Sequence, residues 1–222
     1  PRPLKALFPD LADDDFPRYG EVTGESVYFM RPKAKVRIPT PPQMKNHGNW
    51  VMSVSQLARW MSDQAEELGA YMLPATDCQK LLLDQGRVMG VVTGDKGRGR
   101  DGEELSAFEP GAEVQAQVTV LAEGTPGHLS GLVRGHFDLD RESTQIWELG
   151  VKEVWRVPTP LGKVIHTLGW PLPRDAFGGS FMYPMGPSQV AIGLVVGLDY
   201  DNARLDVHEL LQRMKLHPLF RP

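Results

Sequence analysis

The stretch from Val118 to Ser130 constrains the fold of this chain more than any other segment. Apolar, β-favouring residues at 118–121 lead into Ala122, Glu123 and Gly124, and an apolar-spaced segment follows at 129–133. This order predicts a strand, a tight turn and the start of a helix, a geometry that directs backbone N–H groups at one point where an anion such as a phosphate can bind. The same junction joins elements in any α/β domain, so the pattern by itself favours a structural role.

Length and composition are those of a soluble globular protein. The 222 residues suffice for one large domain or two small ones, and 41% are hydrophobic and 23% charged. A net charge of −4, with no Lys/Arg run interleaved with aromatic residues, argues against nucleic acid as a partner. No apolar run has the length of a membrane span, and no signal peptide opens the chain.

The cysteine and histidine content argues against a metal site within the chain. Cys78 is the single cysteine, which excludes an internal disulfide and a zinc or iron–sulfur site built from cysteines. We interpret it as a small buried residue at the entry of a strand. The six histidines show no close pairing. No metal ligands are therefore predicted.

Residues 1–50 are expected to be largely irregular. A short strand is predicted at 27–30, a basic–apolar alternation follows at 33–38, and the prolines at 39–42 stop regular structure. The apolar residues Phe29, Met30 and Ile38, beside lysines and arginines, suit contact with a bilayer surface. A solvated strand edge protected by lysines explains the same pattern equally well.

The clearest helix is predicted over residues 54–68, with Ser53 or Ser55 as its cap and Gly69 at its end. Trp60 is expected to pack. Further along, the pattern predicts a strand at 71–73, a hairpin of 79–83 with 88–92, an exposed loop at 94–104, and a strand at 114–121 that leads into the opening turn.

The sequence pattern of the second half of the chain predicts a β-sheet. Four strands are predicted, at 146–157, 163–170, 179–183 and 190–198, with no helix between them, which indicates an antiparallel arrangement. The last of these is apolar on both faces and should be central. Asp206 and Glu209 have the spacing of a capping box that opens a final helix.

Two features inside this sheet have alternative explanations. The paired glycines Gly178 and Gly179 at a strand start permit close approach by a flat ring or another chain, although pattern alone favours a bulge or turn. His166 lies inside a strand and is expected to be a satisfied histidine rather than a catalytic base.

Several separate segments together resemble a known family. They are residues 46–50, 64–69, 122–124, 127–129, 150–155, 166–172, 178–183 and 193–200. In this order and spacing they are similar to the middle of the electron transfer flavoprotein–ubiquinone oxidoreductases. The related FixC-type oxidoreductases and geranylgeranyl reductases match less well at 169–172 and 178–180.

The resemblance implies an α/β (α+β) fold with two parts. Residues 1–144 would form a partial FAD-binding, Rossmann-like domain with a long irregular N-terminal segment, and residues 145–222 an antiparallel-sheet, ubiquinone-binding domain. The family also carries an iron–sulfur domain.

The resemblance further implies two sets of site residues. The second flavin-contacting turn would be formed by Ala122, Glu123, Gly124 and Thr125 to Gly127, and residues 46–49 would lie near the flavin. Gly178 and Gly179 would contact the ubiquinone head group, in an apolar slot beside Phe177, Phe181 and Met182.

Two departures from the family pattern point to an internal fragment. No G-x-G-x-x-G turn for the FAD pyrophosphate precedes residue 46, and the cysteines that bind the family's [4Fe–4S] cluster are missing. The chain also begins at Pro1 and ends in mid-pattern at Pro222. We therefore expect these residues alone to hold FAD weakly and to house no cluster.

The expected function is that of the whole enzyme: transfer of electrons from reduced electron transfer flavoprotein to ubiquinone through FAD and a [4Fe–4S] cluster. No catalytic side chain is predicted, because the reaction moves electrons between cofactors. Peripheral attachment to the bacterial or mitochondrial inner membrane is implied. The alternatives are a flavin-dependent reductase or monooxygenase of a lipid-like substrate, and a non-catalytic flavoprotein remnant.

Overall fold

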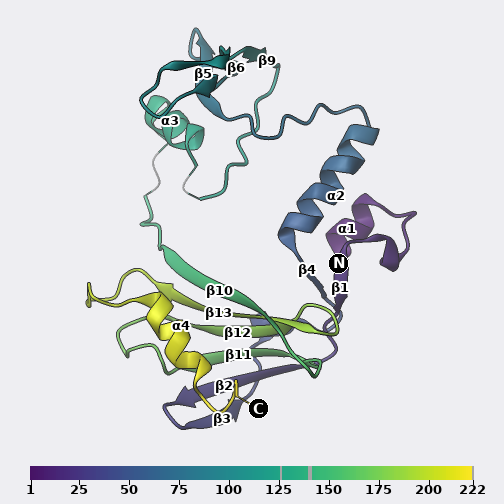
Figure 1. Cartoon of the computed structure of the whole chain (residues 1–222), viewed down its shortest axis with the longest axis vertical. Coiled ribbons are helices and arrows are strands. Elements are labelled where there is room, and N and C mark those ends of the chain that lie inside the picture. Colours follow the sequence, from purple (N-terminus) through teal and green to yellow (C-terminus); the bar gives the residue numbers. More distant parts are fainter. Residues whose placement is uncertain (126, 140–141, 222) are drawn as a thin grey trace. The chain divides into compact units, whose positions relative to one another are not determined.

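The computed structural model describes residues 1–125, 127–139 and 142–221, and its contacts divide the chain into two compact units. Unit 1 combines residues 1–69 with residues from 145 onward, and unit 2 comprises residues 70–144 (Figure 1). The predicted boundary also lies at 144/145, but the contacts group residues 1–69, predicted to belong to the first domain, with the second half of the chain. The assignment of residues 1–144 to a flavin domain stays a prediction.

Unit 1 is built on a six-stranded sheet in the order β10-β13-β12-β11-β2-β3. Its strands are β10 (Glu148–Arg156), β13 (Gln189–Gly197), β12 (Gly178–Pro184), β11 (Val164–Gly169), β2 (Glu25–Arg31) and β3 (Ala34–Ile38). The strands predicted at 27–30 and in the second half are thereby confirmed, and β13 is central and almost wholly buried.

The sheet is mixed rather than purely antiparallel. Strand β2 pairs with β11 in parallel, whereas the other neighbours in this sheet are antiparallel. A parallel pair needs a long connection between its strands, so sequence spacing could not reveal this one. The predicted strand at 27–30 is the middle of β2, and the expectation of a largely irregular stretch at 1–50 was wrong for residues 34–38, which form β3.

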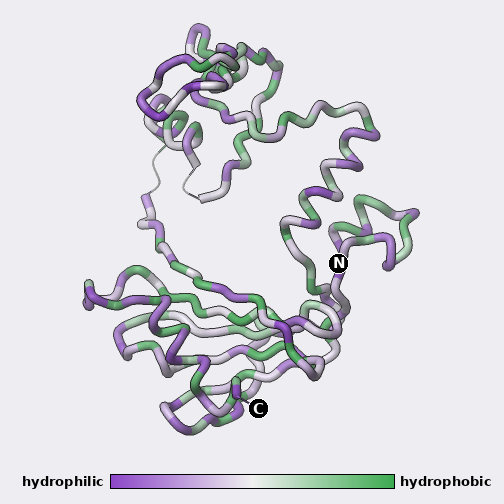
Figure 2. The backbone as a smooth tube through the Cα atoms, in the orientation of Figure 1, coloured by the Kyte–Doolittle hydropathy of each residue, from purple (hydrophilic) through white to green (hydrophobic). Residues whose placement is uncertain are grey.

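Helix α4 (Val207–Lys215) covers one face of the sheet. Its cap is the predicted one, since Asp206 Oδ1 accepts a hydrogen bond from the Glu209 N–H at 3.0 Å. Buried side chains of the helix and of β13 form the main core: Ile192, Leu194, Val196, Val207, Leu210, Leu211 and Met214, together with Met30. Figure 2 shows how the hydropathy colours alternate along β10 and α4.

Side chains alternate along a strand, so the neighbours of these core residues point to the opposite face. This second face carries His166 and Val164 of β11, Gly179, Phe181 and Tyr183 of β12, and Gly193 of β13. Buried on the α4 side, by contrast, Thr167 and Ser180 hydrogen-bond to each other across β11 and β12.

The remaining elements of unit 1 surround an aromatic cluster. They are α1 (Arg2–Leu7), η1 (Asp13–Asp15), β1 (Arg18–Glu21), η2 (Pro42–Met44), β4 (Trp50–Met52), which pairs with β1, and α2 (Val54–Glu67). Trp60 packs on Phe8 and Phe16, as predicted, at ring distances of 4.8 and 5.4 Å.

Helix α2 begins and ends where predicted but buries no residue. Ser53 Oγ accepts from the Gln56 N–H at 3.4 Å, and Gly69 follows the helix with φ +90°. Val54 and Leu68, on its predicted apolar side, are 79% and 87% exposed. None of the described helices is long and apolar enough to cross a bilayer.

Unit 2 contains two small sheets and one helix. The sheets are β5 (Cys78–Asp84), β6 (Arg87–Thr93) and β9 (Glu113–Gln115), and β7 (Lys96–Arg98) with β8 (Glu104–Glu109); the helix is α3 (Leu129–His136). The β5–β6 hairpin is confirmed. Gln85 and Gly86 both have positive φ (44° and 78°), as a type I′ turn requires.

Three predictions in this unit were wrong. Residues 71–73 form no strand, the loop at 94–104 contains β7, and the strand expected at 114–121 ends at Gln115. Val118 and Val120 are 76% and 81% exposed. A strand is stabilised by its ladder partners, and none of the described residues pairs with 118–121.

Candidate functional site

The glycine pair opens β12, at the place where three strands approach one another closely. A Cβ on Gly178 would overlap the Val195 carbonyl of β13, and a Cβ on Gly179 would overlap the Thr167 carbonyl of β11. Gly178 also has φ +145°. Both positions therefore require glycine for strand packing, independently of any ligand.

Gly178 also forms part of the wall of a pocket of about 680 Å³. The pocket lies where β2 and β11 end and β12 begins, and it is mainly apolar; its lining includes Phe29, Met30, Gly169, Trp170, Leu172 and Gly178, with Arg31 and Arg174. Its volume falls within the usual range for small-molecule sites. We call this pocket the slot.

The other residues predicted for the quinone site lie elsewhere. Gly179 and Phe181 belong to the second face, where a Cβ on Gly193 would overlap the Phe181 ring, which stacks on Tyr183 at 5.4 Å. Phe177 is 70% exposed, and its carbonyl accepts from the Gly197 N–H at 2.8 Å. The structure thus brings Gly178 to the slot without Phe177 or Phe181.

Trp170 and Leu172 were not predicted as site residues, although they lie in a segment that carried the family resemblance. The signal that could have identified them is the run of residues 169–172, in which a glycine with φ +87° precedes a tryptophan and a proline. A Cβ on Gly169 would lie 2.8 Å from the Met30 carbonyl. This glycine therefore lets the two strand ends meet at the slot.

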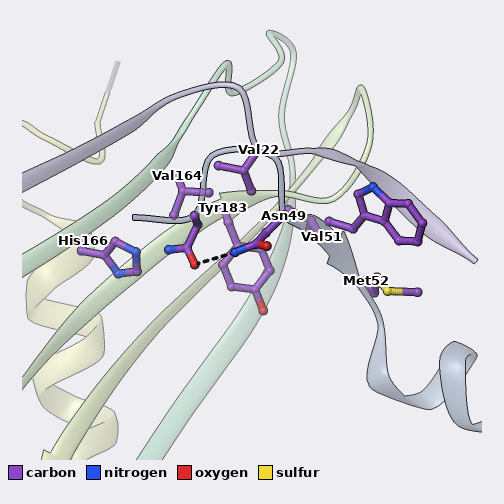
Figure 3. Close-up of a pocket in the computed structure, with 9 residues that line it drawn as sticks. Val22, Asn49, Val51, Met52, Val164, His166 and Tyr183 are labelled. Carbon is purple, nitrogen blue, oxygen red and sulfur yellow. Dashed lines mark hydrogen bonds between the residues drawn. The ribbon is translucent and has the colours of Figure 1, made fainter. Parts of the chain in front are cut away.

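A second, smaller pocket of about 250 Å³ lies at the opposite end of β11 and β12, beside the loop 46–49. Val164, His166 and Tyr183 line it from the sheet, and Asn46 and Asn49 line it from the loop (Figure 3). Asn49 Nδ2 donates to Asn46 Oδ1 at 3.4 Å. We call it the histidine pocket.

The prediction that His166 is a satisfied histidine was wrong. Its Nε2 atom is buried and has no hydrogen-bond partner among the described residues. Burial lowers the pKa of the imidazole, and the nearby charge of Glu25 partly opposes that shift. Glu25 also fixes the loop, because its Oε1 accepts from the N–H groups of Asn46 and His47 at 2.6 and 3.0 Å.

The turn at residues 122–127 directs N–H groups at an anion, as predicted, but that anion is the carboxylate of Glu123 in the turn itself. The carboxylate of Glu123 accepts hydrogen bonds from the N–H groups of His128, Leu129 and Ser130, at 3.2, 3.0 and 2.7 Å, and from the Ser130 hydroxyl at 2.6 Å. These bonds, led by the one from the Ser130 side chain, lower the pKa of Glu123 to about 2. A phosphate at the start of α3 would have to displace this carboxylate.

The rest of the turn still fits a flavin contact made through the backbone. Ala122, Gly124 and Thr125 are exposed, and Gly124 and Gly127 have φ of +70° and +65°. A Cβ on Gly127 would lie 3.1 Å from Ser130 and 3.2 Å from Glu123 Oε2, so glycine there protects the cap. Pro126, which the predicted turn includes, lies outside the described residues.

Among the described residues, no three His, Cys, Asp or Glu side chains are grouped so that they could hold a metal ion. The turn at residues 122–127, which is predicted to contact flavin, belongs to unit 2, whereas the slot and the histidine pocket belong to unit 1.

Comparisons with known proteins identify the family. Residues 147–222 match the family model described as ETF-QO, ubiquinone-binding. The chain is 43% identical over 99% of its length to a probable electron transfer flavoprotein–ubiquinone oxidoreductase of Schizosaccharomyces pombe. It is 39% identical to the human enzyme and 37% identical to that of Pseudomonas aeruginosa, each over 100% of its length. The chain spans only 36%, 37% and 42% of these three relatives.

Two solved structures have a similar fold, and one of them is a flavin-dependent enzyme. A geranylgeranyl bacteriochlorophyll reductase-like protein of Thermoplasma acidophilum aligns with 98% of the chain and 50% of its own, with TM-score 0.66 and 16% identity. A flavin-dependent brominase aligns with 98% of the chain and 51% of its own, with TM-score 0.62 and 15% identity. At these identities the likeness shows the fold alone, which is consistent with a partial FAD-binding fold.

Proposed function

Because this chain belongs to the electron transfer flavoprotein–ubiquinone oxidoreductase family, we propose that it forms part of an enzyme that passes electrons from reduced electron transfer flavoprotein to ubiquinone. The observation that carries the proposal is the slot. It is a mainly apolar pocket of about 680 Å³, most of whose wall comes from residues 169–178. These residues lie inside the segment that matches the ubiquinone-binding model.

The chemistry of the slot suits a quinone. An uncharged ring with an apolar tail needs apolar walls and a few directed hydrogen bonds, and Trp170, Leu172 and Phe29 supply apolar surface. Gly178 forms part of the slot wall, although its lack of a side chain is already required by the packing of β12 on β13. We propose that Gly178 contacts the head group from the slot wall; Gly179, Phe177 and Phe181 lie outside the slot and are not assigned to it.

FAD supplies the two-electron carrier when bound, and we propose that unit 2 provides its second contact. Glu123 holds the turn in place, and the backbone of Ala122, Gly124, Thr125 and Gly127 contacts the cofactor. The loop 46–49 would lie near the flavin. Any [4Fe–4S] cluster would belong to other parts of the enzyme, because Cys78 is the one cysteine here.

We propose that the β2–β3 hairpin contacts the membrane, on the cytoplasmic face of a bacterial inner membrane or on the mitochondrial inner membrane. Phe29 and Val36 pair across the hairpin and are 45% and 56% exposed. Lys33 and Lys35 belong to the same hairpin, and their charges suit anionic lipid, although Lys35 pairs with Met30 and lies on the opposite face from Phe29 and Val36. Met30, one of the apolar residues expected to touch lipid, is only 1% exposed and belongs to the core.

The membrane contact is tested by sedimentation of the full-length enzyme with phosphatidylglycerol vesicles. Replacement of both Phe29 and Val36 by serine should release the enzyme from the vesicles, whereas Val118→Ser, at an exposed position in unit 2, should not. Equal sedimentation of all three proteins would refute the hairpin assignment.

The slot itself is tested by filling it. Ala176 lines the slot, so Ala176→Phe in the full-length enzyme should raise the KM for ubiquinone at least ~10-fold, since a phenyl ring would occupy part of the ligand's volume. Ala107→Phe adds the same ring at an exposed position in β8 and serves as the control. Unchanged quinone kinetics in a folded Ala176→Phe enzyme would contradict the assignment.

A further inference from the structure

The slot is built from two segments that are far apart in the sequence. Residues 29–32, at the end of β2 and in the turn after it, form one wall, which we call the hairpin wall. Residues 169–178, which join β11 to β12, supply the other, which we call the loop wall. The walls meet where the Trp170 N–H donates to the Met30 carbonyl at 3.1 Å. The shape of the slot therefore depends on how these two walls are held together.

His217 contacts both walls without lining the slot. Its Nε2 donates to the Arg31 carbonyl of the hairpin wall at 3.1 Å. Its ring packs on the ring of Trp170 in the loop wall, with the ring centroids 5.5 Å apart. The side chain is buried, and the residues that line the slot do not include it. His217 can therefore act on a ligand in the slot only through the two walls.

The chain around His217 fixes the orientation of its imidazole. Nδ1 accepts a hydrogen bond from the Leu219 N–H at 3.0 Å, so Nε2 carries the proton and serves as the donor toward Arg31. The His217 N–H donates to the Met214 carbonyl of α4 at 3.0 Å, and the His217 carbonyl accepts from the Phe220 N–H at 2.9 Å. The imidazole thus ties the two walls to the end of α4.

We propose that His217 is a positioning residue of the slot, which holds the hairpin wall and the loop wall at the spacing that a quinone ring requires. This inference rests on the proposed function. The groups that line a binding site need packed and hydrogen-bonded neighbours to hold them in place. His217 supplies a hydrogen bond to one wall and a ring contact to the other, so its loss should loosen both.

Two substitutions remove these interactions one at a time. His217→Phe keeps a ring beside Trp170 and removes the hydrogen bond to Arg31. His217→Gln keeps an N–H donor near the place of Nε2 and removes the ring. Each variant should raise the KM for ubiquinone-1 about 10-fold and leave kcat nearly unchanged, because a small displacement of the walls weakens binding of the quinone without changing electron transfer to it.

The assay uses the full-length, flavin-loaded enzyme, with reduced electron transfer flavoprotein as donor and ubiquinone-1 as acceptor. Ferricyanide serves as a parallel acceptor, because a multiply charged anion is disfavoured in an apolar pocket. Its reduction should be unchanged in both His217 variants. The control for lost stability is Val207→Ala, at the opposite end of α4 in the same core, which should leave the KM for ubiquinone-1 unchanged.

A double-mutant cycle tests whether His217 acts through Trp170. Trp170→Leu should raise the KM for ubiquinone-1 by itself, because it removes part of the loop wall. Adding His217→Gln should then raise the KM little further, since no tryptophan ring is left for residue 217 to support. Independent sites would instead multiply their effects on the KM. A double variant whose KM equals that product would contradict the proposed role.

The possible outcomes are distinguishable. If both His217 variants keep the KM of the unmodified enzyme, or slow ferricyanide reduction as much as quinone reduction, the inference is overturned while the proposed function stands. If the unmodified enzyme reduces ferricyanide but not ubiquinone-1, the proposed function fails, and the positioning role with it.

Discussion

The carboxylate of Glu123 holds the start of α3 through Ser130, accepting from its N–H at 2.7 Å and from its hydroxyl at 2.6 Å. Glu123 thus occupies the helix N-terminus at which the strand–turn–helix pattern predicts an anion such as a phosphate. The proposed flavin contact of this turn therefore relies on its backbone rather than on the helix dipole.

Replacement of Glu123 should destabilise unit 2 in a pH-dependent way. Its pKa is about 2, below the ordinary 4.5, because Ser130, Leu129 and His128 donate to the ionised form. A depressed pKa adds stability above pH 4.5, and that stability is lost as pH falls toward 2. Glu123→Gln should therefore lower the urea midpoint at pH 7, and the difference should vanish between pH 4.5 and 2. Glu113→Gln, in exposed β9, is the control, and a pH-independent difference would refute the cap.

Gly193 should tolerate alanine only if Phe181 is shortened. A Cβ at 193 would overlap the Phe181 ring, and overpacking of this kind costs about 1–3 kcal/mol. Gly193→Ala should lower the free energy of unfolding by that amount, and Phe181→Leu in the same chain should recover part of it. Gly162→Ala, which meets no atom within 4 Å, should be neutral. Additive effects in a double-mutant cycle would show that the two sites do not interact.

His217 should be a structural histidine with a fixed tautomer. Its Nδ1 accepts from the Leu219 N–H at 3.0 Å, so Nε2 carries the proton and donates to the Arg31 carbonyl at 3.1 Å. The residue is 2% exposed. His217→Ala would leave buried groups unpaired and should cost roughly 2–4 kcal/mol in urea unfolding. A loss below 0.5 kcal/mol, on the order of a neutral surface change, would contradict this role.

Much of the sheet could be predicted because its information is local. Strands β10 to β13 have either alternating apolar and polar residues or continuous apolar residues, and turn residues separate them. Asp206 indicates the start of α4, because it stands three residues before Glu209, whose N–H it caps. The parallel pairing of β2 with β11 could not be predicted, because it joins segments far apart in the sequence. The strand predicted at residues 118–121 was wrong for a related reason. Residues with high β propensity form a strand only where another strand can pair with them.

Some residues of the candidate site could be predicted from the sequence, and others are revealed only by the fold. Gly178 was named from the family resemblance, because the glycine pattern alone favours a bulge or turn, and the structure places this residue in the slot wall. Trp170 and Leu172 could not be predicted as slot residues, because they line the slot only once the ends of β2 and β11 are brought together. His166 was misjudged because the sequence cannot show whether a histidine inside a strand finds a partner, and here the burial of Nε2 decides the matter.

The most direct test of the central claim is photolabelling of the full-length enzyme with an azido-ubiquinone, followed by mass-spectrometric mapping. The account predicts label on the walls of the slot, in residues 169–178 or 29–32, and loss of that label with excess ubiquinone. Label confined to other segments, in an enzyme that still reduces ubiquinone, would contradict it.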